Sequence, residues 1–243
     1  MPPDPEPLIH PPPIRPLKVY GRKRGFLTPP EKTWLDQTLP NWKLPAADSR
    51  ENLLKCLEAP PQARLILEIG FGNGQFLAPL ATLHPQDRFI GAEVFQEGMA
   101  ALIKRLEKNA IANVRILPCD ARMALTHDIP SNSLDWVIVN FPDPWPKQRH
   151  HKRRIIQPEF LDLLADRMRP GALLTLATDW AEYALWMART QENHPAFLNL
   201  AAPDRFAPEP EFWHATRFQT KGIQAGRTIF HLAWQRVLAS ESL

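Results

Sequence analysis

The stretch "ARLILEIGFGNGQF", residues 63–76, indicates the fold class. Its first half is a short run of leucine and isoleucine, which is typical of a parallel strand buried on both faces. Its second half contains Gly70, Gly72 and Gly74, which allow a tight turn and the close approach of a ligand to the backbone. A helical pattern follows in residues 74–84. A strand, a glycine turn and a helix in this order are the first unit of an open α/β sheet.

The same alternation continues along the chain. Apolar runs at residues 88–94, 113–120, 134–141 and 172–179 predict four further strands. Helical periodicity lies between them, and in one helix it places these residues on one face: Met99, Leu102, Ile103, Leu106 and Ala110. Residues 216–237 contain two strand-like runs without a helix between them. We therefore predict a doubly wound, mostly parallel seven-stranded α/β sheet, Rossmann-like, whose C-terminal strands form an antiparallel pair.

Two helices are expected before the sheet. Residues 28–39 begin with Thr28 as a candidate N-cap, Pro29 suits the first helical position, and Glu31 completes a capping box. Residues 49–59 have apolar positions at helical spacing and predict the second helix.

The chain divides into an N-terminal arm and one domain. Residues 1–27 are rich in proline and lack periodicity, which predicts a flexible arm. The basic end of this arm is either a solvated segment or one that orders on a nucleic acid. Residues 28–243 are long enough for one large core and are expected to form a single domain.

Composition excludes several classes of protein. A hydrophobic content of 44% is ordinary for a globular protein, and a net charge of +3 does not by itself indicate a nucleic-acid partner. Cys56 and Cys119 have no metal-binding or redox spacing, and no apolar run is long enough to cross a bilayer. No signal-peptide pattern begins the chain. We expect a cytoplasmic protein with no metal and no membrane partner.

Acidic residues follow the expected strands, where ligands of open α/β sheets bind. Glu68 lies two residues before Gly70, and the turn reads G-x-G-x-G rather than the G-x-G-x-x-G of dinucleotide sites. A carboxylate there would repel a pyrophosphate but attract an ammonium and a sulfonium. This pattern favours S-adenosylmethionine over a dinucleotide, although a dinucleotide oxidoreductase remains an alternative.

Three further strand ends carry acids. Glu93 ends the second strand and could accept hydrogen bonds from ribose hydroxyls, or could simply be solvated. Asp120 ends the third strand, where it could meet an adenine amino group, cap the next helix, or do both. Asp179 ends the fifth strand and could reach the same crevice or cap the helix after it.

The loop after the fourth strand, residues 140–154, reads "NFPDPWPKQRHHKRR". Three prolines stiffen this loop and would hold Asp143 and Trp145 in place, unless the loop is only a structural turn around a buried tryptophan. A dense basic run follows, comprising Lys147, Arg149, His150, His151, Lys152, Arg153 and Arg154. Such a run is either a solvated face or a strip that contacts phosphates, and the second interpretation explains its density.

Four motifs together carry a resemblance to a known family. They are "LEIGFGNGQF" (67–76), "FPDPWPKQRHHKRRIIQPEF" (141–160), "TDWAEYA" (178–184) and "TRFQTKG" (216–222). With them the chain closely resembles the tRNA (guanine-N7-)-methyltransferase family, which forms 7-methylguanosine at position 46 of the tRNA variable loop. The likeness extends over roughly residues 17–237, and its central proline-tryptophan-basic block is highly specific.

The resemblance implies a role for each matching residue. The implied S-adenosylmethionine contacts are Glu68, Glu93, Asp120 and Asp143, and Asp143 is also implied to be catalytic. The implied substrate contacts are Lys147, Asp179, Thr216, Arg217, Phe218 and Gln219, and residues 149–154 match the RNA-contacting strip. The chain departs from the usual Thr-Lys-Phe-Glu of the last motif, because Arg217 and Gln219 replace the lysine and the glutamate.

The chemistry implied by the family needs no general base. The N7 atom of guanine carries a free lone pair at neutral pH, so Asp143 is expected to orient groups and to stabilise charge rather than to accept a proton. Two rival functions stay open. One is methylation of an amino group on another nucleic acid or a protein, and the other is RNA binding without catalysis. The oligomeric state is left open.

Overall fold

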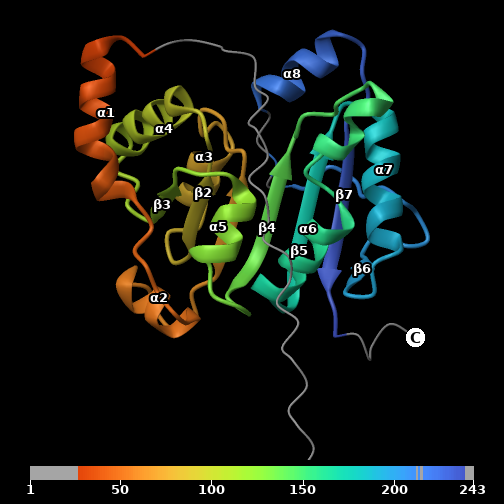
Figure 1. The fold of residues 1–243 in the computed structure, drawn as a ribbon, viewed down its shortest axis with the longest axis horizontal. Helices are drawn as coiled ribbons and strands as arrows, with labels where there is room; N and C mark the ends of the chain where they lie inside the picture. Colours follow the sequence, from red (N-terminus) through yellow and green to blue (C-terminus); the bar gives the residue numbers. More distant parts are fainter. Residues whose placement is uncertain (1–26, 212, 214–215, 239–243) are drawn as a thin grey trace, which may run out of the picture.

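The computed structural model describes residues 27–211, 213 and 216–238, and a seven-stranded sheet forms its centre (Figure 1). The spatial order of the strands is β3-β2-β1-β4-β5-β7-β6. Their bounds are β1 (Leu65–Ile69), β2 (Arg88–Ala92), β3 (Val114–Leu117), β4 (Leu134–Asn140), β5 (Met168–Thr178), β6 (Phe197–Asn199) and β7 (Phe230–Arg236). Strands β1 to β5 are parallel, and β7 runs antiparallel to both β5 and β6. The predicted fold class is confirmed, whereas the expected arm lies almost entirely outside the described residues.

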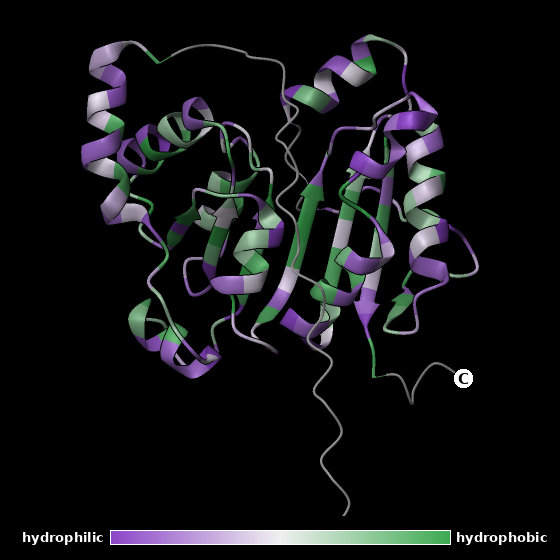
Figure 2. Cartoon of the chain, viewed as in Figure 1, coloured by the Kyte–Doolittle hydropathy of each residue, from purple (hydrophilic) through white to green (hydrophobic). Residues whose placement is uncertain are grey.

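Helices cover both faces of the sheet, as the alternation of side chains along β1 requires. Leu65, Leu67 and Ile69 pack into one core and Ile66 packs into the other, because successive strand residues point to opposite faces. The first core includes α2 (Arg50–Cys56), α5 (Ala121–His127), α6 (Pro158–Arg167) and α7 (Ala181–Glu192). The second includes α1 (Pro29–Trp42), α3 (Leu77–Leu83) and α4 (Gln96–Lys108). Figure 2 shows β4 as mostly hydrophobic, whereas hydrophilic residues recur along α1 and α7.

The capping box expected at the first helix is present. The Glu31 carboxylate accepts hydrogen bonds from the Thr28 backbone N–H at 3.0 Å and from its hydroxyl at 2.9 Å. Helix α1 continues beyond the predicted end, through Pro40 to Trp42. None of the helices in the described part of the chain is long and apolar enough to cross a membrane.

The C-terminal antiparallel pair is correct, but one of its predicted strands is wrong. The run that begins at Thr216 forms helix α8 (Arg217–Gln224), and β7 pairs with β5 and with the short β6 instead. The Thr216 hydroxyl accepts a hydrogen bond from the Gln219 N–H at 3.1 Å and caps the helix. A threonine followed three residues later by glutamine is a helix-start signal, and it outweighs the strand propensity of this run.

The boundary between α6 and β5 also differs from the prediction. The helix ends at Arg167, and the strand begins at Met168 rather than at Ala172. Met168 pairs with Leu134, after which the register shifts before regular pairing resumes at Trp136. Pro170 and Gly171 therefore lie in the irregular first part of β5, where a missing backbone hydrogen bond between strands is tolerated.

Candidate active site

The glycine turn after β1 is open on the side where a ligand would approach. Gly70 and Gly72 have φ of 73° and 58°, and a Cβ at either position would meet nothing within 4 Å. A left-handed backbone at these two positions favours glycine, and the space beside them is free. Gly98 carries no comparable signal in the sequence, yet a Cβ there would collide with the Gly72 carbonyl oxygen. Gly98 thus lets α4 pack against the turn.

Glu93 holds the glycine turn in shape. One carboxylate oxygen accepts from the Gly72 N–H at 2.9 Å, and the other accepts from the Val94 N–H at 2.7 Å and from the Phe95 N–H at 3.2 Å. The side chain is buried, so the alternative of a solvated strand-end acid is wrong. Burial raises the pKa of Glu93, whereas these backbone hydrogen bonds oppose the rise.

Glu68 is the most deeply buried acid of the site. Its residue is 2% exposed, one carboxylate oxygen accepts from the Asn140 amide at 3.4 Å, and the other oxygen has no hydrogen-bond partner. Burial raises the pKa of Glu68 to about 8, and the nearby Glu93 contributes in the same direction. No lysine or arginine in the described residues pairs with either carboxylate. A buried acid without a cation is expensive unless a cationic ligand completes it.

The remaining acids lie around this centre to different degrees. The charge of Asp143 raises the pKa of Glu93, which places these carboxyl groups in one electrostatic environment with Glu68. Asp120 follows β3 and caps α5 by accepting from the Arg122 N–H at 2.9 Å. The capping alternative for Asp120 is therefore confirmed, and its role towards a cofactor stays a prediction.

The loop after β4 is held in a strained conformation. Phe141 and Trp145 have φ of 51° and 44°, values that bulky residues rarely adopt. The backbone N–H of Phe141 donates to the Ala177 carbonyl at 2.8 Å, and the loop between the two residues exposes Asp143. Strain of this kind persists only where the surroundings impose it, so the loop fixes the position of Asp143.

Arg154 supplies much of that constraint. Its side chain is fully buried, donates to the Pro144 carbonyl at 2.9 Å and forms a bidentate ion pair with Glu182 of α7. The guanidinium also stacks over Tyr183 and Trp186, at 4.8 and 5.1 Å from their ring centroids. The expectation that Arg154 contacts RNA does not fit this burial, because the side chain is fully engaged inside the protein.

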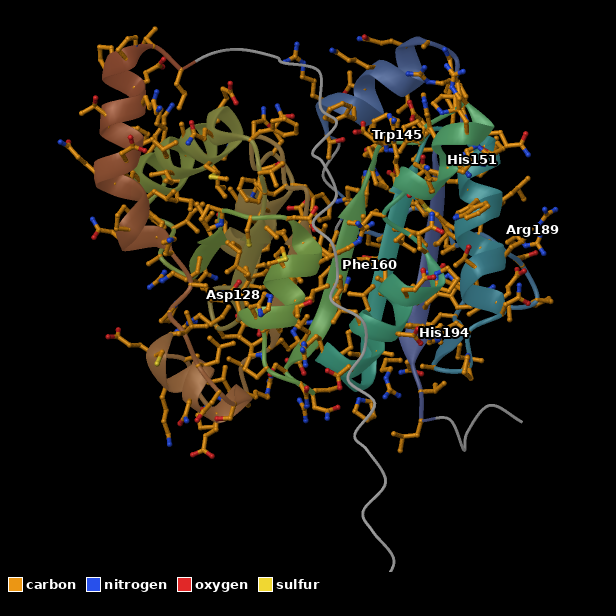
Figure 3. The ribbon with its side chains drawn as sticks, viewed as in Figure 1. Asp128, Trp145, His151, Phe160, Arg189 and His194 are labelled. Atoms are coloured by element: carbon orange, nitrogen blue, oxygen red, sulfur yellow. The ribbon has the colours of Figure 1, made fainter. Side chains whose placement is uncertain are left out.

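Most of the remaining basic run forms a 3-10 helix, η1 (Gln148–Arg153), in which no residue is fully buried. Lys147, Arg149 and Lys152 are exposed and form no ion pair within the described ranges. Arg153 stacks over Trp145 at 4.9 Å. Desolvation lowers the pKa of His150, and the positive charges of the surrounding arginines and lysines lower it further. Figure 3 shows Trp145 and His151 at the same end of the molecule, beside the start of α7.

Helix α8 contacts both the glycine turn and the residue that follows β5. The Arg217 backbone N–H donates to the Gln75 side chain of the glycine turn at 3.0 Å. Asp179 forms an ion pair of 2.9 Å with Arg227 and lies against Gly222, so it does not cap α7, whose N-cap is Trp180. These contacts bring the predicted substrate residues Arg217 and Phe218 to the strand ends.

Gln219 is buried within a polar network rather than directed to solvent. Its amide donates to Glu209 at 2.8 Å and accepts from the Trp213 indole, while Glu209 also pairs with His231 at 3.6 Å. Burial lowers the pKa of His231, although Glu209 opposes this shift. Thr216 and Gln219 therefore fix α8, and any contact with substrate remains a prediction.

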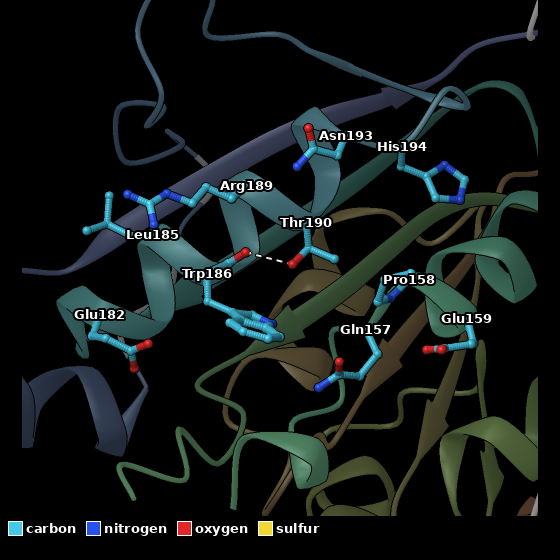
Figure 4. A pocket seen from close by; sticks show the side chains of 10 residues that line it. All are labelled: Gln157, Pro158, Glu159, Glu182, Leu185, Trp186, Arg189, Thr190, Asn193 and His194. Atoms are coloured by element: carbon cyan, nitrogen blue, oxygen red, sulfur yellow. Dashed lines mark hydrogen bonds between the residues drawn. The ribbon is translucent and has the colours of Figure 1, made fainter. Parts of the chain in front are cut away.

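A groove of about 670 Å³ lies between α6 and α7, and neither Glu68 nor Glu93 lines it (Figure 4). Trp186 lies at its centre and donates from its indole to the Ile156 carbonyl at 2.9 Å. His151 packs against the same tryptophan at 5.8 Å, so η1 borders one end of the groove.

The donor set fits a small cationic ligand. Glu68 has a buried, unsatisfied oxygen, and Glu93 bonds the backbone of the open glycine turn. The charge of Asp143, in the loop after β4, acts on Glu93. Carboxylates suit an ammonium and a sulfonium, whereas they oppose a pyrophosphate. In the described part of the chain, no group of three His, Cys, Asp or Glu side chains could hold a metal ion.

Comparison with known proteins agrees with this chemistry. A family model described as "Putative methyltransferase" matches residues 62–232. The tRNA (guanine-N(7)-)-methyltransferase of Magnetococcus marinus is 49% identical over 91% of this chain and 88% of the relative, and that of Bordetella parapertussis is 40% identical over 90% and 85%.

Solved structures share the fold. The 16S rRNA methyltransferase KamB has a TM-score of 0.56 at 18% identity and covers 80% of this chain and 95% of its own. A SAM-dependent O-methyltransferase from Thermotoga maritima has a TM-score of 0.50 at 15% identity and covers 84% and 71%. From its sequence relatives, the chain belongs to the tRNA (guanine-N(7)-)-methyltransferase family.

Proposed function

We propose that the protein transfers a methyl group from S-adenosylmethionine to N7 of guanine at position 46 in the variable loop of tRNA. One observation supports this most strongly. The buried acids Glu68 and Glu93 and the outward-facing cations of η1 flank a single strained loop that carries Asp143. The names of the relatives supply the substrate and the acceptor atom.

The cofactor supplies a methyl group on a sulfonium, and the protein supplies alignment. The expected contacts are Glu68 and Asp143 with the cationic methionine portion and Glu93 and Asp120 with the ribose and adenine. Gly70 and Gly72 leave the space that these contacts need, and Gly74 allows the tight packing of the turn against Leu102. Alignment of donor and acceptor is the main source of rate in such a transfer.

No residue needs to remove a proton from the acceptor, because N7 of guanine reacts through a lone pair. Asp143 would orient the guanine or the cofactor ammonium and stabilise the purine as it becomes cationic. Asp179 can add to this negative field, although its ion pair with Arg227 weakens its contribution. Lys147, Arg217 and Phe218 would position the nucleotide.

The residues of η1 would bind the tRNA backbone. Arg149 and Lys152 are exposed, and His150, His151 and Arg153 are half-buried in the same short helix. Each phosphate that such a strip neutralises releases counterions, which makes binding depend on salt. Substrate tRNA and two free cysteines both fit a reducing cytoplasm, which we propose as the location.

The test is to incubate the protein with methyl-labelled cofactor and unmodified tRNA, and then to locate the label. We expect 7-methylguanosine at position 46 and no product when that nucleotide is 7-deazaguanosine, which lacks the acceptor nitrogen. Label on an exocyclic amino group would instead support an amino-group methyltransferase. Tight tRNA binding without binding of the cofactor in calorimetry would support a non-catalytic RNA-binding protein.

A further inference from the structure

Two phenylalanine rings from different elements lie nearly parallel beside the candidate site. Phe141 follows β4 and Phe218 lies in the first turn of α8, yet their rings are inclined by only 20° and their centroids are 6.5 Å apart. Two stacking intervals of about 3.4 Å, the spacing of stacked bases, add up to about 6.8 Å. The separation of the two rings is therefore close to that of a pair that holds one planar base between them.

The position of Phe141 is imposed rather than relaxed. Its φ of 51° is unusual for a bulky residue, and its N–H bond to the Ala177 carbonyl holds the backbone at the junction with β5. Such strain is found where function needs a side chain in a fixed direction. Asp143 is only two residues further along the same loop.

Phe218 is exposed but lies on an anchored helix. The residue is 53% exposed. Its helix is tied to the glycine turn through the Arg217–Gln75 hydrogen bond and to the end of β5 by close packing of Gly222 on Asp179. Phe218 is therefore accessible to a ligand while its helix is held in place, and a large aromatic ring offers a flat apolar face for stacking.

We propose that Phe141 and Phe218 form an aromatic clamp that stacks on both faces of the target guanine. This proposal rests on the proposed function and adds Phe141 to the residues that contact substrate. The clamp would set the plane of the base, and thereby the direction of its N7 lone pair, without reading its hydrogen-bonding edge. Aromatic faces also attract a cation, so the clamp favours the purine as it acquires positive charge.

The test combines protein variants with the presence or absence of the base. Binding of tRNA with either guanine or an abasic site at position 46 is measured in the presence of S-adenosylhomocysteine, which prevents turnover. Wild-type protein should prefer the tRNA with the base by about tenfold, since stacking on aromatic side chains contributes about 1–3 kcal/mol per base. Phe141→Leu and Phe218→Leu should each lose most of this preference, and Phe218→Tyr should retain it.

Ile223→Ala is the matched control, because Ile223 lies on the same helix, is 57% exposed and has no place in the clamp. It should keep the wild-type preference. An unchanged preference in Phe218→Leu would overturn the clamp, and this variant should fold because its ring is largely exposed. Wild-type formation of 7-methylguanosine at position 46 is measured in parallel. If the wild-type protein forms no 7-methylguanosine there, the proposed function is wrong. If it forms this product but Phe218→Leu keeps the wild-type binding preference, only the clamp is wrong.

Discussion

The acids beside the glycine turn and the cations of the η1 helix differ in burial and in charge. Glu68 and Glu93 are buried, and no described lysine or arginine neutralises them. In η1, Arg149 and Lys152 are exposed and no described acid pairs with them. Buried carboxylates interact strongly with a small cation because the surrounding dielectric is low, whereas exposed cations suit a polyanion whose counterions they displace. Each region is incomplete until its own ligand binds.

Asp143 stands between the two regions, and its replacement should have the largest effect. We expect Asp143→Ala to reduce kcat by about 10³-fold, or about 4 kcal/mol, because the variant removes alignment and charge stabilisation together. The residue is exposed, so thermal stability should change little. Steady-state methylation kinetics and thermal denaturation measure the two quantities. Wild-type turnover in this variant would remove Asp143 from the mechanism.

Glu68 should make the stability of the free protein depend on pH. Its pKa is raised to about 8 in the folded state from an ordinary value of 4.5, so the folded protein keeps a proton that the unfolded chain releases. The contribution of this proton is complete below about pH 4.5 and disappears as the pH rises towards 8. Between about pH 5 and pH 7 the free energy of unfolding should fall by about 3 kcal/mol from this group, at about 1.4 kcal/mol per pH unit.

Denaturant unfolding at several pH values tests this, with Glu68→Gln as the matched control that cannot ionise. The two proteins should differ in how strongly the free energy of unfolding depends on pH. This difference should disappear when a saturating cationic cofactor is added, since a cation favours the ionised carboxylate. Equal pH profiles for the two free proteins would show that Glu68 is already ionised without ligand.

Arg153 and Arg154 are adjacent in sequence, but only Arg154 has a structural role inside the protein. Variants of the two residues therefore distinguish that structural role from the proposed role in binding RNA. Arg154→Leu should lower the free energy of unfolding by about 2 kcal/mol, because it breaks the Pro144 hydrogen bond and the Glu182 ion pair. The ion pair contributes only a small part of this free energy, because the Glu182 side chain is 53% exposed to solvent. Arg153→Leu should change stability much less, and chemical denaturation of both variants measures the difference. Similar destabilisation in the two would mean that Arg154 has no special structural role.

The smallest effect concerns the salt dependence of tRNA binding. Replacing Arg149 and Lys152 by alanine should reduce the slope of log K against log salt by about one unit for each phosphate that is no longer neutralised. Lys32→Ala, on the exposed face of α1, is the control cation and should leave the slope unchanged. Filter binding between low and moderate salt gives the slope. An unaltered slope in the double variant would show that η1 faces bulk solvent in the complex.

Local patterns predict most of the sheet and the position of the acids. The apolar run Leu65–Ile69 indicates a strand buried on both faces, and the carboxyl ends of parallel strands meet at one edge, so Glu68 and Glu93 are expected together. The strand prediction for the segment of α8 is wrong because the threonine and phenylalanine at its start also suit a strand. The capping pair Thr216 and Gln219 is the signal that distinguishes the helix.

The amino-acid sequence alone predicts the fold class, the acids at the ends of the strands and the family. These features depend on short-range periodicity and on residues close together in the chain. Which charges face a ligand depends instead on tertiary packing. Arg154 is neutralised by Glu182 and covered by Tyr183 and Trp186, whereas Arg149, five residues earlier, remains in solvent. The same packing places Phe141 opposite Phe218. Burial and partners depend on segments that are distant in sequence, and no local pattern contains that information.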